Sequence, residues 1–372
     1  PSPAPFPSRH EETMADTWRF LDLGRLSPLD ALAIPEGLLT GVAAGQPDTL
    51  AVWVASEPFV SIGREQEART ACDLEYCKDH RIPVLRRTSG GEALYVDPHR
   101  VFYAVVHRLE EGELGDGTGL FESWLEPIID TCRDFEVDVR FQPYAFLYRG
   151  RYEIGGAHAV VRDGVLLLTA HLAVNVSETT AKEALGIREG DERDHPLTSL
   201  RHEYEGHAPP ELLEIRNALA RSFRKGKEIT FQEGDLITPE LLAANEVRQR
   251  LEDEAWLYRV DRAVDAVRAT PEEGGLRVWR NHRATEGCRL DLTLVTEGGA
   301  TIRDLKISGT PLFLQEEGLT QVENYLRGCY LNPATVGERI LDLYDKLGLV
   351  SPGTNAADFL ILIGDTIDKM SP

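Results

Sequence analysis

The sequence predicts an α+β protein in which a large mixed sheet is followed by a smaller α/β unit. Apolar or alternating runs typical of strands occupy residues 50–54, 59–62, 101–106, 154–161 and 165–174. Helical patterns lie at residues 120–134 and 210–223. Because strands and helices do not alternate regularly, the pattern excludes a doubly wound parallel fold.

Individual helices carry their own signals. The helix over 210–223 opens with Pro210, whose fixed φ suits a first turn. Cys132 lies in the helix over 120–134, so we interpret it as a core residue. A further helix is expected over residues 72–80.

A smaller second unit is predicted from residue 276 onward. Strand patterns at 288–295 and 300–307 flank Glu297-Gly298-Gly299 as a hairpin, and helices are expected over 320–326 and 333–347. The charged segment before it ends in Pro and Gly residues, as linkers do. We therefore predict a flexible tail (1–15), a large domain (16–250), a linker (251–275) and an accessory domain (276–372).

Charge and hydropathy limit the classes of partner. A net charge of -22 disfavours binding to nucleic acid or to anionic membranes. The apolar runs at 165–168 and 359–363 are too short to cross a bilayer. Residues 1–13 lack the apolar core of a secretory signal, and we expect no helix-turn-helix before Trp18. Neither nucleic acid nor membrane is expected as a partner.

The cysteines indicate a reducing compartment. Five of them, an odd number, are scattered along the chain: Cys72, Cys77, Cys132, Cys288 and Cys329. This usage predicts a cytoplasmic protein without disulfides. Cys72 and Cys77 lack a matching His or Cys pair, so no metal site is expected.

A glycine-containing turn after the predicted strand near residue 85 is the clearest candidate for a binding site. It reads Arg86-Arg87-Thr88-Ser89-Gly90-Gly91-Glu92. Glycines let backbone amides approach a ligand, and the arginines supply fixed charge suited to a carboxylate or phosphate. Neighbouring strand residues alternate in direction, so one arginine should face the pocket and the other should form a surface ion pair. The alternative to a binding site is an ordinary turn between two strands.

Two histidines belong to the next pair of strands. His158 and His171 flank the turn Arg162-Asp163-Gly164, which would bring them together as a hairpin. Either residue is a candidate general base, and a structural role is the alternative interpretation.

These features, in their order along the chain, resemble the lipoate-protein ligases, a family related to biotin-protein ligases and octanoyltransferases. Residues 60–66 are similar to the family's strand and turn before the first helix, and residues 86–97 to its arginine pair and glycine-rich acyl loop. Residues 150–157 resemble its lysine-bearing strand. Segments 196–200 and 326–329 extend the likeness, so that it covers nearly all of residues 16–347.

The resemblance implies a set of functional residues. An acyl site would comprise Arg86, Ser89, Gly90, Gly91, Glu92, Gly155 and Gly156. A nucleotide site would comprise Arg64, Tyr144, Ala145, Tyr152 and Ala157. The implied cofactors are ATP and Mg²⁺, the substrate group is lipoate or octanoate, and the acceptor is a lipoyl domain or a glycine-cleavage H-type protein.

Four departures fall on the chemistry of that site. The family's catalytic lysine position holds Tyr152, or Glu153 after a one-residue shift. Tyr144-Ala145 replaces an Asn-Asp pair, Glu92 replaces a glycine, and Thr169-Ala170 replaces a His-Gly pair. Without the lysine and the metal-binding carboxylate, the standard ATP-dependent mechanism lacks its charge stabilisation. The sequence thus predicts a lipoyl or octanoyl transferase, or else a non-catalytic homologue that binds an acyl group, nucleotide or lipoyl-domain partner in the same cleft.

Overall fold

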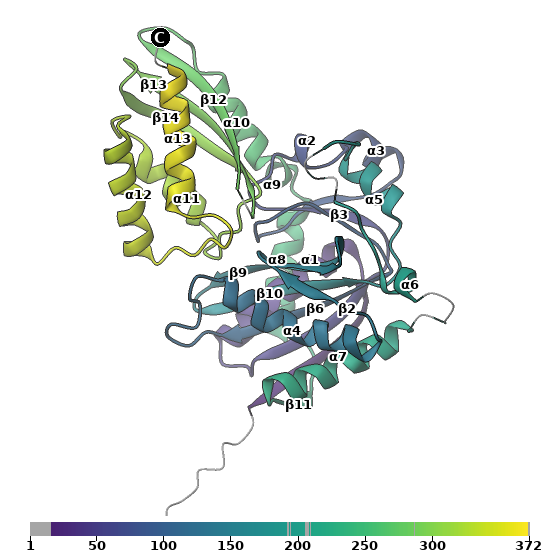
Figure 1. Ribbon diagram of the computed structural model, residues 1–372. Coiled ribbons are helices and arrows are strands. Elements are labelled where there is room, and N and C mark those ends of the chain that lie inside the picture. Colours follow the sequence, from purple (N-terminus) through teal and green to yellow (C-terminus); the bar gives the residue numbers. More distant parts are fainter. Residues whose placement is uncertain are drawn as a thin grey trace, which may run out of the picture.

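The computed structural model describes residues 16–370, except residues 192, 194, 205–207, 209 and 286. The predicted tail over residues 1–15 lies outside this part. Figure 1 shows a large layered domain, purple to teal, with a smaller green-to-yellow domain on one side of it. The α+β class predicted from the sequence is confirmed.

The large domain is built on an eight-stranded mixed sheet with the order β11-β1-β2-β6-β10-β9-β8-β7. Strand β1 pairs in parallel with β2 and β11, and the remaining neighbours are antiparallel. The strands are β1 (Thr17–Leu26), β2 (Thr49–Ala55), β6 (Arg100–Arg108), β7 (Arg140–Gln142), β8 (Phe146–Arg149), β9 (Tyr152–Arg162), β10 (Val165–Ala173) and β11 (Thr230–Glu233).

Helices cover both faces of this sheet. Helices α4 (Thr118–Asp134) and α7 (Leu212–Lys227) pack together on one face, and α1 (Pro28–Ala43) and α8 (Thr238–Glu252) on the other. Every residue of β10 is buried as a result, which explains its nearly continuous apolar run.

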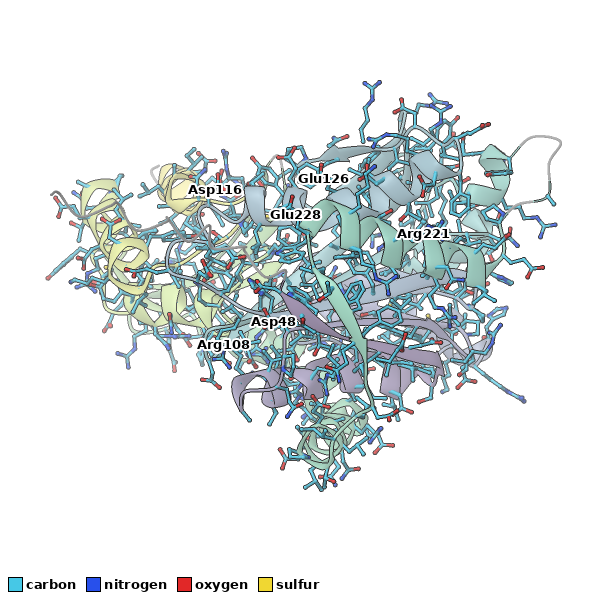
Figure 2. The ribbon with its side chains drawn as sticks, turned by 90° about the horizontal axis from the view of Figure 1, so that it is seen from below. Asp48, Arg108, Asp116, Glu126, Arg221 and Glu228 are labelled. Carbon is cyan, nitrogen blue, oxygen red and sulfur yellow. The ribbon has the colours of Figure 1, made fainter. Side chains whose placement is uncertain are left out.

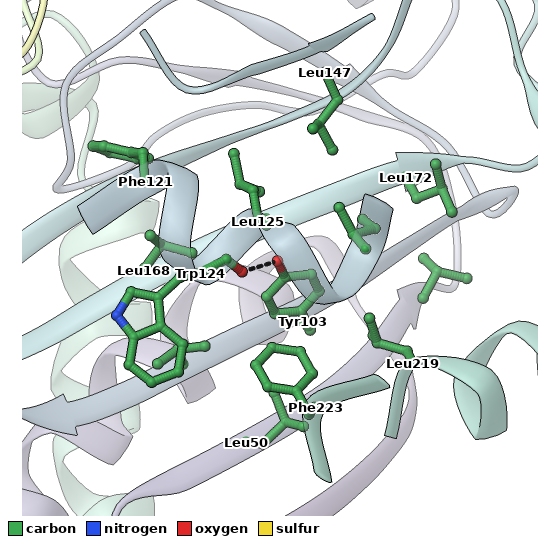
Figure 3. Packing of buried hydrophobic residues seen from close by; sticks show 14 of the residues in the cluster. Leu50, Tyr103, Phe121, Trp124, Leu125, Leu147, Leu168, Leu172, Leu219 and Phe223 are labelled. Carbon is green, nitrogen blue, oxygen red and sulfur yellow. Dashed lines mark hydrogen bonds between the residues drawn. The ribbon is translucent and has the colours of Figure 1, made fainter. Parts of the chain in front are cut away.

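The α4–α7 face contains the larger apolar core. Figure 3 shows Tyr103, Trp124 and Phe223 packed there among leucines. The Tyr103 hydroxyl donates a 2.6 Å hydrogen bond to the backbone oxygen of Trp124, so the buried phenol is satisfied. Cys132 lies in the same core, as expected from its helix.

A three-stranded sheet, β4-β3-β5, forms a second layer beside the large sheet. It comprises β3 (Phe59–Ile62), β4 (Val84–Arg86) and β5 (Leu94–Val96), and short helices α2 (Ala68–Ala71), α3 (Leu74–Asp79) and α5 (Glu178–Leu185) pack around it. Helix α6 (Leu200–Glu203) follows this layer in the chain. The turn with the two glycines joins β4 to β5.

The smaller domain has a three-stranded antiparallel sheet with helices on it. Its strands are β12 (Leu276–Ala284), β13 (Arg289–Glu297) and β14 (Thr301–Gly309). Its helices are α11 (Gly318–Leu326), α12 (Pro333–Leu347) and α13 (Ala356–Met370), which share one apolar core with the sheet. The predicted hairpin and the helix over 333–347 are present.

The segment predicted as a linker is largely helical. It contains α9 (Glu254–Leu257) and α10 (Arg259–Arg268), and α10 packs on β13 and β14. Strand β12 begins at Leu276, where we predict the second unit to start; the domain boundaries themselves stay a prediction.

Other sequence expectations differ in detail. Helix α7 begins two residues after Pro210, where Glu211 and Glu214 form a capping box, and it runs past the predicted end to Lys227.

All five cysteines are free and buried. Among the described helices, none is long and apolar enough to span a membrane.

Candidate functional site

A partly enclosed cavity lies between the turn with the two glycines and the β9–β10 hairpin. Its volume is about 120 Å³. It adjoins a wider groove of about 780 Å³ that runs along the accessory domain, since Gln66, Glu92, Phe146 and Thr310 line both. Apolar side chains form much of the cavity wall: Ala93, Leu94, Leu185, Ile187, Leu197 and Leu312. We call this cavity the pocket.

The two glycines of the turn pack closely against the backbone of Pro311, which follows strand β14 of the accessory domain. A Cβ atom on Gly90 would lie 2.2 Å from the backbone oxygen of Pro311. Gly91 has φ of +86°, and its amide donates to the same oxygen at 3.2 Å. Gly91 lines the pocket, whereas Gly90 is committed to this contact between the domains.

Arg87, not Arg86, lines the pocket. The guanidinium of Arg86 is fully buried and donates to five backbone oxygens, those of Gly63, Arg64, Gln66, Trp256 and Leu257. One arginine of the pair therefore faces the pocket, as alternation predicts. The other was expected in a surface ion pair, and its place at the surface is wrong: Arg86 is buried and pairs with the buried Asp261 at 3.8 Å. Its backbone bonds join the segment after β3 to α9.

The Arg87 guanidinium is partly engaged. Its terminal nitrogens donate to the backbone oxygens of Ser61, Gly90 and Glu92 at 2.7–2.9 Å. Its Nε is buried and has no hydrogen-bond partner among the described residues. Burial lowers the pKa of Arg87 to about 9.

Ser89 is joined to the opposite wall by a hydrogen bond. Its Oγ and His158 Nδ1 lie 2.7 Å apart, which ties the turn to β9. Ser89 itself faces a small cavity beside Glu36 and Thr88, while His158 lines the pocket as well. Ser89 thus positions the turn rather than contacting the pocket directly.

The two histidines do lie near one another on the hairpin. His158 pairs with Thr169 and His171 with Gly156 in the register of β9 and β10, and both imidazoles line the pocket. Burial and then the charge of Arg87 hold the pKa of His158 well below its ordinary value. Burial and Arg100 do the same to the pKa of His171, whose Nδ1 accepts a 3.0 Å bond from Arg100. Both rings are therefore neutral near pH 7.

The structure distinguishes the two candidates for the family's lysine position. A β-bulge interrupts the pairing of β8 with β9, because Leu147 pairs with Gly155 whereas Tyr148 pairs with Glu153. Ile154 consequently points into the apolar core, and Glu153 lines the pocket. Tyr152 is 37% exposed, and its hydroxyl accepts a bond from Arg151 outside the pocket.

Two carboxyl groups therefore face the pocket. Glu92 lines it as a partly buried residue, and burial raises the pKa of its carboxyl against the pull of His195, Arg193 and Arg87. Burial, aided by the charge of Glu92, raises the pKa of Glu153 to about 7, although Arg100 opposes the shift. In the part of the chain that the structure describes, no donor forms a hydrogen bond with the carboxyl group of Glu92 or of Glu153.

The residues expected at a nucleotide site are dispersed. Arg64 is buried and pairs with Glu316 and Glu317 of the accessory domain. Tyr144 lines the pocket at the domain contact, since a Cβ on Gly287 would lie 2.5 Å from its ring. Ala145 lies in the apolar core.

The strand glycines behave differently from one another. A Cβ on Gly155 would meet the backbone oxygen of His171 at 2.3 Å, so this glycine serves strand packing. Gly156 and Ala157 line the pocket. Thr169 faces the small cavity beside Ser89, and Ala170 is buried in the core.

Sequence reasoning missed Arg100, which is 2% exposed and lines the pocket from β6. Its Nε is a second buried donor without a partner among the described residues. The signal in the sequence was an arginine at the start of an otherwise apolar strand. Arg193 was missed too, and its donors bond Asp191 and three backbone carbonyl groups, those of Thr70, Leu185 and Gly186.

The residues present do not fit a magnesium nucleotide. Cationic side chains line the pocket and could meet a phosphate: Arg87, Arg100, Lys182 and Arg193. Glu92 and Glu153, however, stand where the family resemblance implies a glycine and a lysine. Ala145, in the core, offers no oxygen side chain to a metal ion. Within the described residues, no group of three or more His, Cys, Asp or Glu side chains is arranged to hold a metal.

The mixed sheet, the turn with the two glycines beside a pocket and the appended small domain define the fold class of the lipoate ligases. Residues 27–224 match the model of the lipoyl protein ligase A/B catalytic domain. The chain therefore belongs to that family, as its sequence motifs predicted.

Relatives and solved structures agree with this assignment. An octanoyltransferase LipM of Halalkalibacterium halodurans is 21% identical over 280 residues, which cover 66% of this chain and 99% of the relative. The structure of P. falciparum LipL1 in complex with lipoate has a TM-score of 0.66 at 14% identity and covers 89% of this chain and 98% of its own.

Two further structures match about two thirds of the chain. A lipoate-protein ligase A bound with ATP has a TM-score of 0.58 at 24% identity, covering 66% of this chain and 99% of its own. A bipartite lipoate protein ligase from Thermoplasma acidophilum, described with its E2 lipoyl domain, has a TM-score of 0.59 at 23% identity and covers 66% and 97%. These likenesses establish the shared fold.

Proposed function

We propose that this protein binds a lipoyl or octanoyl group in the pocket and transfers it from an activated donor to a lysine of a lipoyl domain. The observation that carries the proposal is a pair of buried donors without a partner among the described residues, Arg87 Nε and Arg100 Nε, on residues that line a cavity with a partly apolar wall. An acyl carbonyl oxygen would satisfy a buried donor that is costly to leave unbonded. Its hydrocarbon chain would lie against the leucine-rich wall.

The donor must already be activated, because a free carboxylate does not react with an amine and the described residues form no group of three or more ligands for the metal ion of a magnesium nucleotide. An acyl thioester meets this requirement. Transfer through a cysteine of this chain is not supported: the pocket-lining residues described include no cysteine, and Cys72 and Cys77 are buried around the β4-β3-β5 layer. We therefore propose direct transfer from the thioester to the lysine amine.

The acceptor and the compartment are part of the same proposal. The E2 lipoyl domain described with the bipartite ligase motivates a lipoyl-domain acceptor, and an H-type protein of glycine cleavage is the second acceptor class we propose. The five unpaired cysteines favour a reducing compartment, the cytoplasm.

The alternative is a homologue that binds the acyl group without transferring it. The replacement of the family's lysine position by Glu153 and of its glycine by Glu92 favours this alternative. Incubation of the full chain with octanoyl thioester and a lipoyl domain, followed by mass spectrometry of the domain, separates the two. Octanoylation above the rate without protein supports transfer, whereas octanoyl binding with no octanoylated product supports the alternative.

A further inference from the structure

Arg100, which lines the pocket, has one edge of its guanidinium group without a hydrogen-bond partner among the described residues. The side chain comes from the first residue of β6, and the residue is 2% exposed. Its Nη1 bonds His171 Nδ1 at 3.0 Å, whereas its buried Nε and its Nη2 bond no described residue. The N–H groups of Nε and Nη2 lie side by side on one rigid plane, so both can donate to the same oxygen atom.

The other cations that line the pocket have fewer open donors among the described residues. The Nη atoms of Arg87 donate to three backbone oxygens, which leaves only its Nε open. All three nitrogens of the Arg193 guanidinium donate to a neighbouring carboxylate or to backbone carbonyl groups. Lys182 pairs with Glu178. These contacts leave every cation charged, so what distinguishes Arg100 is its pair of adjacent open N–H groups.

Neighbouring residues fix the position of Arg100 and leave space beside it. His171 bonds Nη1 and packs against Phe102 of β6, with the ring centroids 5.7 Å apart. A Cβ atom on Gly156 would lie 3.7 Å from His171 Nε2, so the glycine keeps this part of the pocket open. Burial lowers the pKa of Arg100, but an arginine keeps its proton near neutral pH. Arg100 is therefore a charged donor that is already oriented before a ligand binds.

Two carboxyl groups attract Arg100 without bonding it. The charges of Asp97 and Glu153 raise the pKa of Arg100 against the effect of burial. Neither carboxyl group accepts a hydrogen bond from the guanidinium among the described contacts. The Nε and Nη2 atoms thus remain open to an oxygen atom of a ligand, and a buried donor that stays unbonded costs free energy.

We propose that Arg100 holds the acyl carbonyl oxygen through Nε and Nη2 and stabilises the negative charge that develops on it during transfer. This inference rests on the proposed function, because the carbonyl belongs to the thioester of that reaction. The acceptor lysine, as a neutral amine, forms a C–N bond at the carbonyl carbon, and the C=O π electrons move to the oxygen held by Arg100. The C=O bond then forms again and the C–S bond breaks with its electron pair on sulfur. One proton passes from the nitrogen to the departing sulfur, which leaves an amide and a thiol.

Infrared spectroscopy on the full chain tests the contact without any transfer. The probe is decan-3-one labelled with ¹³C at its carbonyl, a ketone in which a methylene group replaces the thioester sulfur. Because hydrogen bonds from a cation weaken the C=O bond, we expect the ketone bound to the native chain to absorb at a lower wavenumber than the ketone bound to R100M. R100K keeps the charge but loses the paired N–H groups, so its band should lie between the two.

The exposed Arg140 of β7 provides the matched control, and R140A should give the native band. A native band at the position that the ketone has in hexane would overturn the proposal, and this outcome needs no variant. The same holds for an R100M band equal to the native one. If R100M does not fold, an R100K band equal to the native one overturns the paired contact.

The transfer assay gives a second readout. R100M should lower kcat by about 10²–10³-fold with little change in KM, as for the loss of a donor to a developing oxyanion, and R100K should recover part of that loss. An R100M kcat equal to that of the native chain would refute the role of Arg100 while leaving acyl transfer established. Absence of transfer by the native chain would instead refute the proposed function, and the ketone band would still report whether Arg100 bonds an acyl carbonyl.

Discussion

Arg86 and Arg87 are neighbours in the sequence but serve different parts of the molecule. Arg87 lines the pocket, and Arg86 donates to five backbone oxygens at a buried junction between β3, α9 and the turn. Arg86 therefore holds the fold around the turn, and Arg87 is the arginine available to a ligand in the proposed site.

Replacement of Arg86 should destabilise the fold. R86M removes every one of these donors and leaves the buried carbonyl groups unpaired, so we expect the free energy of unfolding to fall by about 3 kcal/mol or more. Urea denaturation measures the free energy of unfolding. R140A, at an exposed arginine of β7, is the matched control and should change stability by less than about 0.5 kcal/mol. Equal stability of R86M and R140A would contradict the structural role of Arg86.

Glu153 should make stability depend on pH. Its folded pKa of about 7 lies above the ordinary value of 4.5, so its favourable contribution is complete below about pH 4.5 and is lost as the pH rises through 7. E153Q should therefore be more stable than the native chain by about 2 kcal/mol at pH 8, and this difference should vanish near pH 4.5. Chemical denaturation at both pH values checks this, and a pH-independent difference would count against the buried carboxyl.

His107, on the far side of the large sheet from the pocket, should make the stability of the fold depend on pH. Burial lowers its pKa, but the hydrogen bonds that His107 donates to the carboxylates of Asp48 and Glu113, together with their charge, outweigh burial and raise the pKa above 6.5. Figure 2 labels Asp48 and Arg108, whose backbone N–H donates to the same Asp48 carboxylate. The stabilisation is complete below pH 6.5 and is lost as the pH rises through the raised folded pKa. H107Q should thus lose more stability at pH 6 than at pH 9.5 in paired thermal melts; the reverse order would refute the assignment.

Y152K should not create ligase activity. Tyr152 is exposed outside the pocket, and Ala145 supplies no metal ligand, so a lysine there cannot act alone. The assay is formation of lipoyl-adenylate from lipoate, ATP and Mg²⁺. Formation of lipoyl-adenylate by Y152K would contradict this expectation and would mean that β8 and β9 pair in a different register.

Glu92 should exclude free lipoate. Its carboxyl faces the pocket and opposes a ligand carboxylate, so the native chain should bind lipoate with negligible affinity. E92G should improve binding by about 1–3 kcal/mol in calorimetry. Tight binding by the native chain, or no gain in the variant, would contradict this account of the turn.

The fold was largely predictable because its strands and helices carry strong local signals. The strand Phe59–Ile62 and the helix Pro333–Leu347 have the predicted bounds, the latter because Asn332 caps its start and Gly348 its end. The helices of the predicted linker were not recognised. Their charged sequence masks the apolar stripe of Val260, Val264 and Val267 that packs on the accessory sheet.

The candidate site was only partly predictable from the sequence. The turn with the two glycines and the histidine hairpin were found through motif and spacing. The choice between Tyr152 and Glu153 depends on a one-residue bulge, which a sequence pattern of period two does not reveal. Arg64, Arg86 and Arg100 lie in buried networks that form only when distant segments meet.

A donor competition tests the central claim most directly. The full chain is incubated with a lipoyl domain, a deuterated octanoyl thioester and unlabelled octanoate with ATP and Mg²⁺, and the mass of the modified lysine reports the donor. The account predicts deuterated octanoyl-lysine, formed at the same rate when ATP is omitted. Unlabelled octanoyl-lysine that requires ATP would contradict it.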